Sequence, residues 1–229
     1  MGLHKLLSSA VATDWRGASR ESSRIAPRPE TTPEPVVQVY SARAFSWRGI
    51  FAVHTWISIK SENAKEYTVY EVVGWHALEG GSALQIHNNE PDRYWFGARP
   101  EILSDIRGAK AVKAIEGIKA AVKAYPYADT YRTWPGPNSN TFTAFIIRHV
   151  RELVTDLPPT AIGKDYLPGG AVFDRAPNGN GVQISFLGVF GILVSVNEGI
   201  EFNVLSLSFG IDPRDLAIRL PVVGKIGLR

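Results

Sequence analysis

The sequence predicts an α+β fold in which antiparallel strands pack against two main helices, and three observations support this class. Residues 51–60 and 67–75 alternate in side-chain polarity on either side of a polar turn, which is typical of a β-hairpin. Apolar residues recur every three or four positions in residues 100–124 and again after Asn138, which is typical of amphipathic helices. Residues 182–209 are apolar stretches broken by glycines and predict two or three strands. We therefore expect an antiparallel meander or a small barrel packed on the helices.

The composition predicts one folded domain preceded by an extended arm. The chain has 229 residues, of which 45% are hydrophobic, and this is enough to bury a substantial core. Residues 1–35 are rich in Ser, Arg, Thr and Pro, with four prolines between Pro27 and Pro35. We expect residues 1–35 to form the extended arm and residues 36–229 to form a single α+β domain.

The residue inventory excludes several kinds of chemistry. The chain contains no cysteine, so it has no disulfide, no thiol nucleophile and no Cys-ligated zinc. Its five histidines form neither an HExxH nor an HxH motif, and we expect no metal site and no cofactor. The net charge is +3, without a Lys/Arg block interleaved with aromatic residues. We therefore expect no nucleic-acid partner.

The hydropathy pattern predicts neither a transmembrane helix nor a clear signal peptide. No apolar run reaches 18 residues, and the stretch from Leu6 to Ala12 is short and broken by serines. We expect a soluble chain, either cytoplasmic or associated with the cell envelope. The lysines between Lys110 and Lys123 would suit an anionic membrane surface, but a solvated helix face is the commoner explanation.

The predicted hairpin contains the first candidate site residues. If Ser61 pairs with Glu66, the residue numbers of paired positions add up to 127, and Glu71 lies diagonal to His54 on one face of the sheet. A register shifted by one residue would instead place Tyr70 beside His54. The proximity of His54 and Glu71 therefore depends on the register.

The second candidate region is the start of a predicted helix after Trp134. Pro135 and Pro137 cannot continue a preceding helix, whereas Asn138 and Ser139 are favourable N-cap residues. Backbone N–H groups at a helix start favour negative charge. Ser139 is thus either a simple cap or a nucleophile close to an oxyanion site, and the sequence leaves both alternatives open.

The order of these parts resembles the circularly permuted papain-like superfamily, of the lecithin:retinol acyltransferase-like type. The resemblance covers roughly residues 50–155 and rests on the strand segment around His54, Tyr125-Pro-Tyr127, and Asn138-Ser-Asn-Thr-Phe142. It implies hydrolysis or acyl transfer at amide or ester bonds. His54 would be the general base, Ser139 would replace the usual cysteine, and Glu71 would orient the imidazole. The departure from the superfamily pattern is the missing cysteine.

The chain as a whole, including residues 158–166 and the glycine-rich segment that follows, also resembles an uncharacterised bacterial domain family. That resemblance implies no particular activity. The alternative to catalysis is a non-catalytic relative, in which the same cleft binds a small molecule, lipid or peptide with a polar or anionic group. Arg132, Trp134, Asn138 and Asn140 are its candidate binding residues, with the Arg132 guanidinium as an anion clamp near the helix start.

Overall fold

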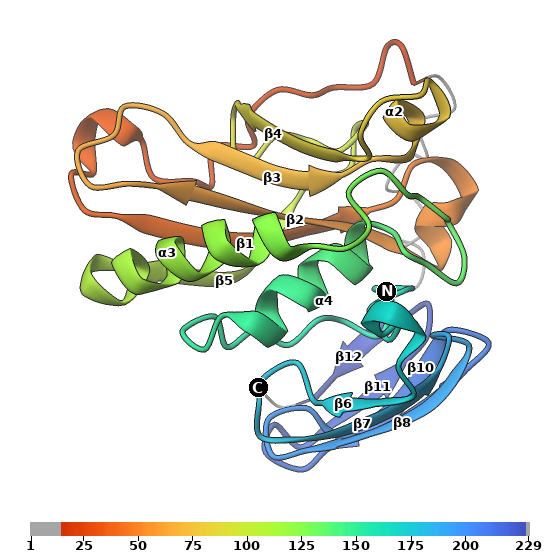
Figure 1. The fold of residues 1–229 in the computed structure, drawn as a ribbon. Helices are drawn as coiled ribbons and strands as arrows, with labels where there is room; N and C mark the ends of the chain where they lie inside the picture. Colours follow the sequence, from red (N-terminus) through yellow and green to blue (C-terminus); the bar gives the residue numbers. More distant parts are fainter. Residues whose placement is uncertain (1–14, 228–229) are drawn as a thin grey trace.

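The computed structural model describes residues 15–227, and within this range the chain forms three layers. Figure 1 shows an antiparallel first sheet, a layer of helices beneath it, and an antiparallel second sheet below the helices. The predicted α+β class is confirmed, but both sheets have free edge strands, so the expected small barrel is not formed. Residues 1–14 of the predicted arm lie outside the described residues.

The first sheet has five strands in the order β4-β3-β2-β1-β5. These strands are β1 (Val36–Arg43), β2 (Val53–Lys60), β3 (Thr68–Val72), β4 (Leu84–Asn88) and β5 (Glu101–Arg107). The short helical turns are η1 (Pro29–Thr31), η2 (Ser46–Ile50) and α2 (Gly74–Leu78). The predicted hairpin is formed, and of the two registers considered it has the one in which paired residue numbers add up to 127, since Ile57 pairs with Tyr70 and Ile59 pairs with Thr68.

Strand β5 corrects the prediction of a helix over residues 100–124. Residues 101–107 pair with β1, but the register shifts by one residue between Val39 and Tyr40, which leaves Leu103 of β5 as the extra residue of a β-bulge. As a result Ile102 packs on one side of the sheet, while Leu103 and Ile106 pack on the other. A bulge therefore creates the three-residue spacing that a helix also shows, and the helix itself begins only at Gly108.

Two helices, α3 (Gly108–Ala124) and α4 (Ser139–His149), cover one side of the first sheet. The main core lies between the sheet and these helices, where Val39 and Ile57 meet Ile118 and Phe142. The predicted start of α4 is confirmed, since Asn138 is its N-cap residue. The apolar positions continue at helical spacing to Val154, but α4 itself ends at His149.

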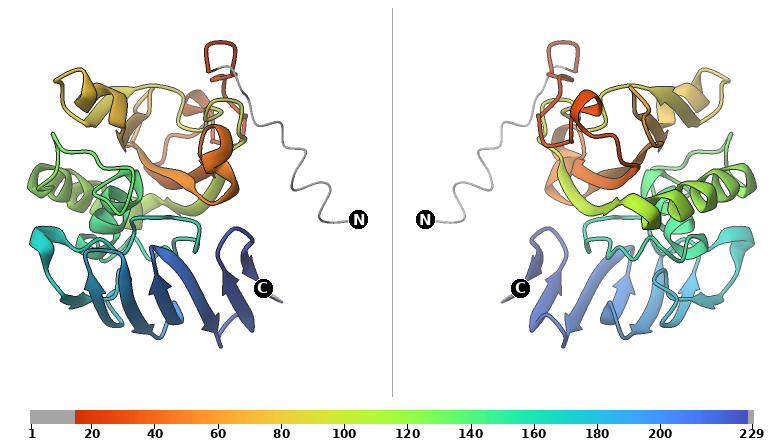
Figure 2. Two further views of the ribbon diagram at one scale, coloured as in Figure 1. Left: turned by 90° about the vertical axis from the view of Figure 1, so that its right-hand side faces the viewer. Right: turned by 90° about the vertical axis from the view of Figure 1, so that its left-hand side faces the viewer.

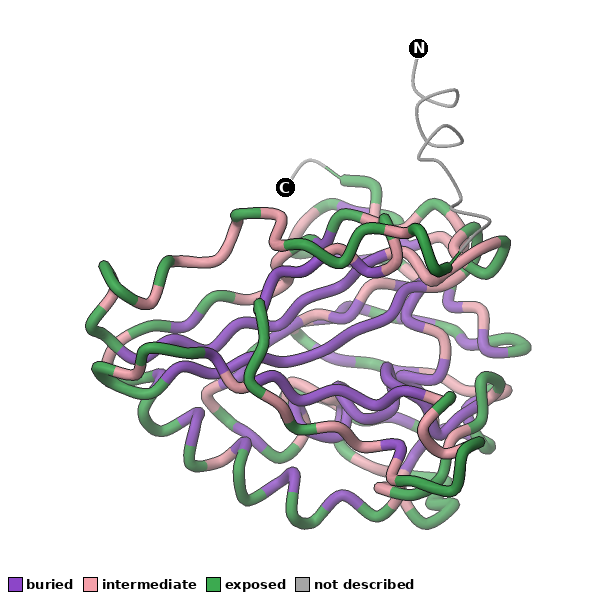
Figure 3. The backbone as a smooth tube through the Cα atoms, turned by 90° about the horizontal axis from the view of Figure 1, so that it is seen from above, coloured by how far each residue is buried: buried purple, intermediate pink, exposed green. Residues whose placement is uncertain are grey.

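The other side of the first sheet is covered by non-regular segments, so the central strands are buried on both faces (Figure 3). Its apolar cluster consists of Tyr40, Ala42, Trp56, Val69, Val73 and Trp95. The segment after residue 15 is held here by Asp92, whose carboxylate accepts hydrogen bonds from the Ser22 hydroxyl (2.7 Å) and the Ile25 amide (2.6 Å). Residues 19–26 thus lie against the loop that connects β4 to β5, whereas Pro27 and Glu34 accept hydrogen bonds from Tyr67 and Lys60 of the β2–β3 hairpin.

The second sheet is a meander of seven strands in the order β12-β11-β10-β9-β8-β7-β6 (Figure 2). After the turn η3 (Pro168–Gly170) the strands are β6 (Phe173–Arg175), β7 (Gly181–Phe186), β8 (Phe190–Ser195), β9 (Gly199–Val204), β10 (Leu207–Asp212), β11 (Ala217–Leu220) and β12 (Gly224–Ile226). The expectation of two or three strands over residues 182–209 was too low, because four strands, β7 to β10, fall largely in that interval. The segment after Pro221, which carries no strand signal, adds the edge strand β12.

Candidate functional site

Three side chains, from the first sheet and the loop after β4, surround one buried carboxylate. Glu71 on β3 accepts hydrogen bonds from His54 Nε2 (3.2 Å), His87 Nε2 (2.8 Å) and an Arg93 Nη2 (2.5 Å). His54 lies on β2, His87 on β4, and Arg93 in the loop after β4. We call Glu71, His54, His87 and Arg93 the Glu71 cluster. Its geometry follows from the hairpin register, which places Glu71 diagonal to His54.

Aromatic rings enclose the buried end of the Glu71 cluster. The Trp95 ring stacks on the His54 imidazole with the ring centroids 3.6 Å apart and the planes 8° from parallel. Trp75 stacks on Trp95 from the outer side at 5.8 Å and is itself 42% exposed. A continuous aromatic stack therefore leads from His54 to the surface.

Burial and hydrogen bonding fix the charge states inside the cluster. Burial lowers the pKa of His54, and this effect outweighs the hydrogen bond and charge of Glu71, so His54 is neutral at neutral pH. Burial alone would raise the pKa of Glu71, but the hydrogen bonds from the two histidines and the positive charge of Arg93 hold it well below its usual range. The cluster thus contains an ionised Glu71 paired with Arg93, while His54 Nε2 donates its proton to the carboxylate.

Arg93 has hydrogen-bonding capacity to spare. Its Nη2 is bonded to Glu71, whereas its buried Nη1 has no hydrogen-bond partner among the described residues. The guanidinium also lies near the rings of Trp56 (5.8 Å) and Trp95 (5.7 Å). A buried donor without a partner is uncommon in folded proteins and calls for an explanation.

The structure does not bring the predicted pair His54 and Ser139 together. On β2, neighbouring side chains point to opposite faces of the sheet. His54 points toward Trp95, whereas Thr55 points toward α4, where its hydroxyl donates to Asn140 Oδ1 (2.9 Å) and accepts from the Thr143 hydroxyl (2.9 Å). Ser139 is the first residue of α4 and lies on the Thr55 side, with its carbonyl 3.4 Å from the Thr55 hydroxyl. The body of the first sheet therefore separates the imidazole from the serine.

Asn138 and Asn140, which are candidate binding residues, both hold the backbone together. Asn138 Oδ1 accepts from the amides of Asn140 (3.0 Å) and Thr141 (3.2 Å), and the Thr141 hydroxyl accepts from the Asn138 amide (3.1 Å). This capping box fills the start of α4 with the protein's own groups. The side-chain amides of Asn138 (3.0 Å) and Asn140 (2.8 Å) both donate to the Ile162 carbonyl. The helix start is therefore occupied rather than open to an anion.

Arg132 and Trp134, the other two candidate binding residues, lie on the surface before α4. Both side chains are exposed, and Trp134 Nε1 donates to the carbonyl of Leu205 in the second sheet (3.3 Å). The two residues thus flank a helix start whose own polar groups are already paired. The structure does not join them to Asn138 and Asn140 as one binding surface.

The comparison with protein families places this architecture. A family model described as a protein of unknown function, DUF3750, matches residues 34–166, which is more than half of the chain. The chain belongs to the DUF3750 family. No curated protein and no solved structure matches it. The predicted resemblance to an uncharacterised domain family is thereby confirmed, and the DUF3750 match spans the first sheet, both helices and the whole Glu71 cluster.

Sequence reasoning identified two members of the Glu71 cluster and missed the other two. His87 follows from the pairing of β4 with β3, where it stands opposite Val69 and two residues from the partner of Glu71. Arg93 and Trp95 carry no periodic signal, because they lie in a loop that tertiary contacts fold over the sheet. Within residues 15–227, no group of three or more His, Asp or Glu side chains is arranged to hold a metal ion. In the same range, no helix is both long and apolar enough to cross a membrane.

Proposed function

We propose that this DUF3750 protein is a non-catalytic binding protein that recognises a carboxylate- or phosphate-bearing ligand at the Glu71 cluster. The observation that carries the proposal is the buried Arg93 Nη1 without a hydrogen-bond partner. Because Nη2 already donates to Glu71, Nη1 is the donor left for a ligand, and hydrogen bonds from a guanidinium to a carboxylate or phosphate are among the strong ones. An anionic group of the ligand supplies the acceptor that the protein itself does not provide.

The exposed parts of the cluster define where the ligand makes contact. His87 and Arg93 donate to the same oxygen of Glu71, so their side chains lie next to each other. The His87 side chain is 31% exposed, whereas those of His54, Glu71 and Arg93 are at most 9% exposed, so a ligand reaches Arg93 only past His87. Trp75 offers an exposed ring at the end of the aromatic stack. We infer that an anionic group binds at His87 and Arg93, and that a planar or apolar part of the ligand packs on Trp75.

Catalysis by a Ser/His pair receives no support from the geometry, because Ser139 and His54 lie on opposite sides of the first sheet. The relation to the permuted papain-like superfamily remains a prediction, as does a bacterial origin. A position at the cell envelope likewise remains a prediction. Catalysis has a direct test, which is the hydrolysis of a simple ester such as p-nitrophenyl acetate. We expect equal rates for the wild type, Ser139→Ala and His54→Gln, whereas a large loss in both variants would favour the catalytic alternative.

Binding is tested with acetate and inorganic phosphate as probes and tryptophan fluorescence as the signal. Trp56 and Trp95 lie beside the Arg93 guanidinium, so occupancy should change their emission with a saturable dependence on the anion. His87→Gln and Arg93→Lys should weaken the response at least tenfold. Arg132→Lys is the matched control, because this exposed arginine lies outside the cluster, and it should respond as the wild type does. A wild type that gives no saturable response, or variants that respond unchanged, would overturn the proposal.

A further inference from the structure

The second sheet has its polar face toward the interior of the protein and its apolar face toward solvent. Along β7, Gln183 and Ser185 are buried, whereas Val182, Ile184 and Phe186 are exposed. The same alternation continues in β9, where Glu201 and Asn203 are buried between exposed apolar neighbours. A sheet in a soluble domain normally packs its apolar face into the core, so this arrangement is inverted.

The inner face is polar because it receives charged groups from the loop before it. Lys164 is buried and contacts the carboxylates of Asp165 (3.1 Å) and Glu201. Asp165 in turn accepts from Gln183 Nε2 (2.6 Å) and Asn203 Nδ2 (3.2 Å). Burial alone would lower the pKa of Lys164, but the two carboxylates raise it, so the lysine remains charged. The polar side chains of the inner face are thus already paired with groups of the same chain.

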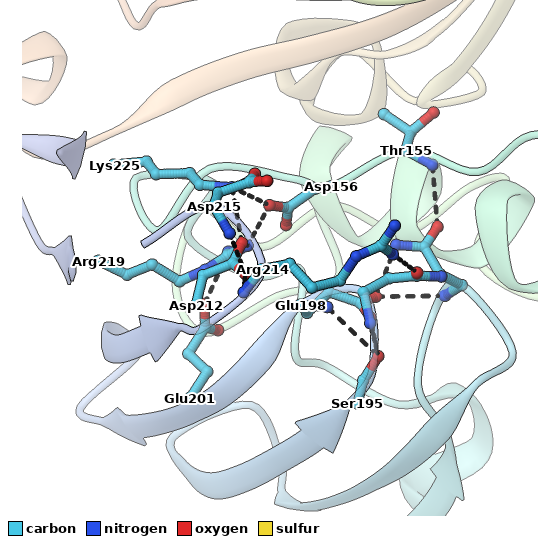
Figure 4. Close-up of polar contacts among 12 residues, drawn as sticks. Thr155, Asp156, Ser195, Glu198, Glu201, Asp212, Arg214, Asp215, Arg219 and Lys225 are labelled. Carbon is cyan, nitrogen blue, oxygen red and sulfur yellow. Dashed lines mark hydrogen bonds and ion pairs between the residues drawn. The ribbon is translucent and has the colours of Figure 1, made fainter. Parts of the chain in front are cut away.

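A second group of ion pairs continues this network toward the last strands. Figure 4 shows Arg219 on β11 contacting Asp156, and Lys225 on β12 contacting Asp212 (2.7 Å) and Asp215 (2.5 Å). The hollows on this inner side have room for no more than a water molecule. The polar face therefore has no space for a further partner.

The outer face is a continuous apolar ladder. Thirteen side chains, each between 36% and 62% exposed, form what we call the outer face: Phe173, Val182, Ile184, Phe186, Phe190, Val194, Ile200, Phe202, Val204, Phe209, Ile211, Ile218 and Ile226. The strand register places them side by side, for example Phe202 beside Phe209, and the half-buried Ile192 on the other side of Phe202 completes this central row. In Figures 1 and 2 no other described element lies on this side of the second sheet.

The size of the outer face exceeds what a monomer normally exposes. A large aromatic side chain buries about 150–250 Å² when fully packed, so thirteen roughly half-exposed Val, Ile and Phe side chains present on the order of 1,000 Å². The largest apolar patch of a typical monomer covers about 300–600 Å². A stable protein interface buries about 800 Å² on each partner, and obligate homodimers bury more. The outer face therefore has the size and apolar character of half of a permanent interface.

We propose that the outer face packs against the outer face of a second copy of this chain, forming a symmetric β-sandwich across the interface. Two identical apolar sheets are self-complementary about a twofold axis, and stacked sheets about 10 Å apart interdigitate such side chains. The composition favours a protein surface over a lipid surface. Residues 173–226 contain no Trp or Tyr, and their one lysine, Lys225, is paired with aspartates. Of their three arginines, Arg219 is buried in ion pairs and Arg214 donates to Asn197, which leaves the exposed Arg175 on the edge strand β6. A membrane-facing surface typically carries an aromatic belt and free basic residues.

The first test is the mass in solution, measured by light scattering and sedimentation velocity on the full chain without detergent. The wild type should have twice the chain mass of 25.1 kDa. Phe202→Glu, at the centre of the outer face on the middle strand β9, should give a monomer with an unchanged far-UV CD spectrum. Leu78→Glu is the matched control, because Leu78 is 89% exposed on α2 on the far side of the first sheet, and this variant should stay dimeric. A monomeric wild type overturns the proposal, and flotation of that monomer with phosphatidylcholine vesicles would identify the face as a lipid contact instead.

The second test identifies the face independently of Phe202→Glu. Because the chain has no cysteine, a single introduced cysteine reports on one position only. Under mild oxidation, at least one of Ile192→Cys, Phe202→Cys and Phe209→Cys should form a disulfide-linked dimer, since these residues form the central row of the outer face. Leu78→Cys should remain uncrosslinked. A dimer in which none of the three central positions crosslinks would show that another surface mediates association, and would overturn the proposal.

Discussion

Replacing Glu71 with glutamine tests the view that the cluster is a buried ion pair on which the fold depends. The carboxylate accepts three hydrogen bonds, including one from Arg93 at 2.5 Å and one from His87 at 2.8 Å. Hydrogen bonds to charged groups contribute about 1.5–3 kcal/mol each, and removing one partner of a buried ion pair typically costs about 3–5 kcal/mol. Glutamine keeps the shape and one acceptor oxygen, so we expect Glu71→Gln to lower the free energy of unfolding by about 3 kcal/mol.

The assay for Glu71→Gln is urea unfolding at 25 °C, followed by tryptophan fluorescence and far-UV CD. Glu66→Gln is the matched control, since its exposed carboxylate accepts from Asn88 Nδ2 (2.9 Å) on the neighbouring strand, and it should change stability by less than about 0.5 kcal/mol. Adding Arg93→Met to Glu71→Gln should recover part of the loss, because the unpaired guanidinium is then removed. A loss below about 1 kcal/mol in Glu71→Gln, or no recovery in the double variant, would refute this account.

Three further outcomes follow from the described contacts. The pKa of His54 is lowered in the folded state, so the unfolded chain binds the proton first, and stability should decline as pH falls below the ordinary pKa of 6.5. In His54→Gln the midpoint of urea unfolding should depend less on pH between pH 7.5 and about 5. Asn138→Ala should lower the free energy of unfolding by about 2 kcal/mol or more, because it removes a buried helix cap. Ser139→Ala should lower it by less than about 1 kcal/mol, because the Ser139 hydroxyl makes no hydrogen bond among the described residues. Equal losses in urea unfolding would contradict this comparison. Gly163→Ala should abolish cooperative thermal unfolding or lower its midpoint strongly, because its φ is +96° and an added Cβ would lie 2.4 Å from Asn138 Nδ2; a midpoint within a few degrees of the wild type would show that the loop adapts.

The sequence predicted the elements whose signals are local. The β2–β3 register followed from the turn between Ser61 and Glu66, and it correctly placed Glu71 beside His54. The start of a helix after Pro137 followed from the adjacent prolines and capping residues, although the sequence left the cap open between Asn138 and Ser139 and the structure assigns it to Asn138. The prediction of a helix over residues 100–107 was wrong, because a bulge in β5 produces the same spacing of apolar residues as a helix. The segment is a strand because it pairs with the edge of β1 that β2 does not cover. The local spacing of apolar residues does not predict which strands pair with each other.

The catalytic pair shows the limit of an argument from the order of motifs. The order of a histidine strand followed by a capped helix is present, but chain order does not specify the face of the sheet on which a side chain lies. One position decides the outcome: Thr55, rather than His54, faces α4. The histidine instead meets Trp95, which arrives in a loop without a periodic signal. Predicting the site thus required the packing of α4 against one face, which depends on contacts far apart in sequence.

The second sheet shows why alternation alone does not locate a core. In β9 the pattern of Ile200, Glu201, Phe202 and Asn203 is that of a strand with one apolar face, and the usual inference would bury Ile200 and Phe202. The chain instead buries Glu201, because Lys164 and Arg219 supply countercharges on the inner side. Once that face is held by ion pairs within the chain, the apolar face can be removed from water only by another surface. The same residues that stabilise the monomer's interior therefore create the requirement for association.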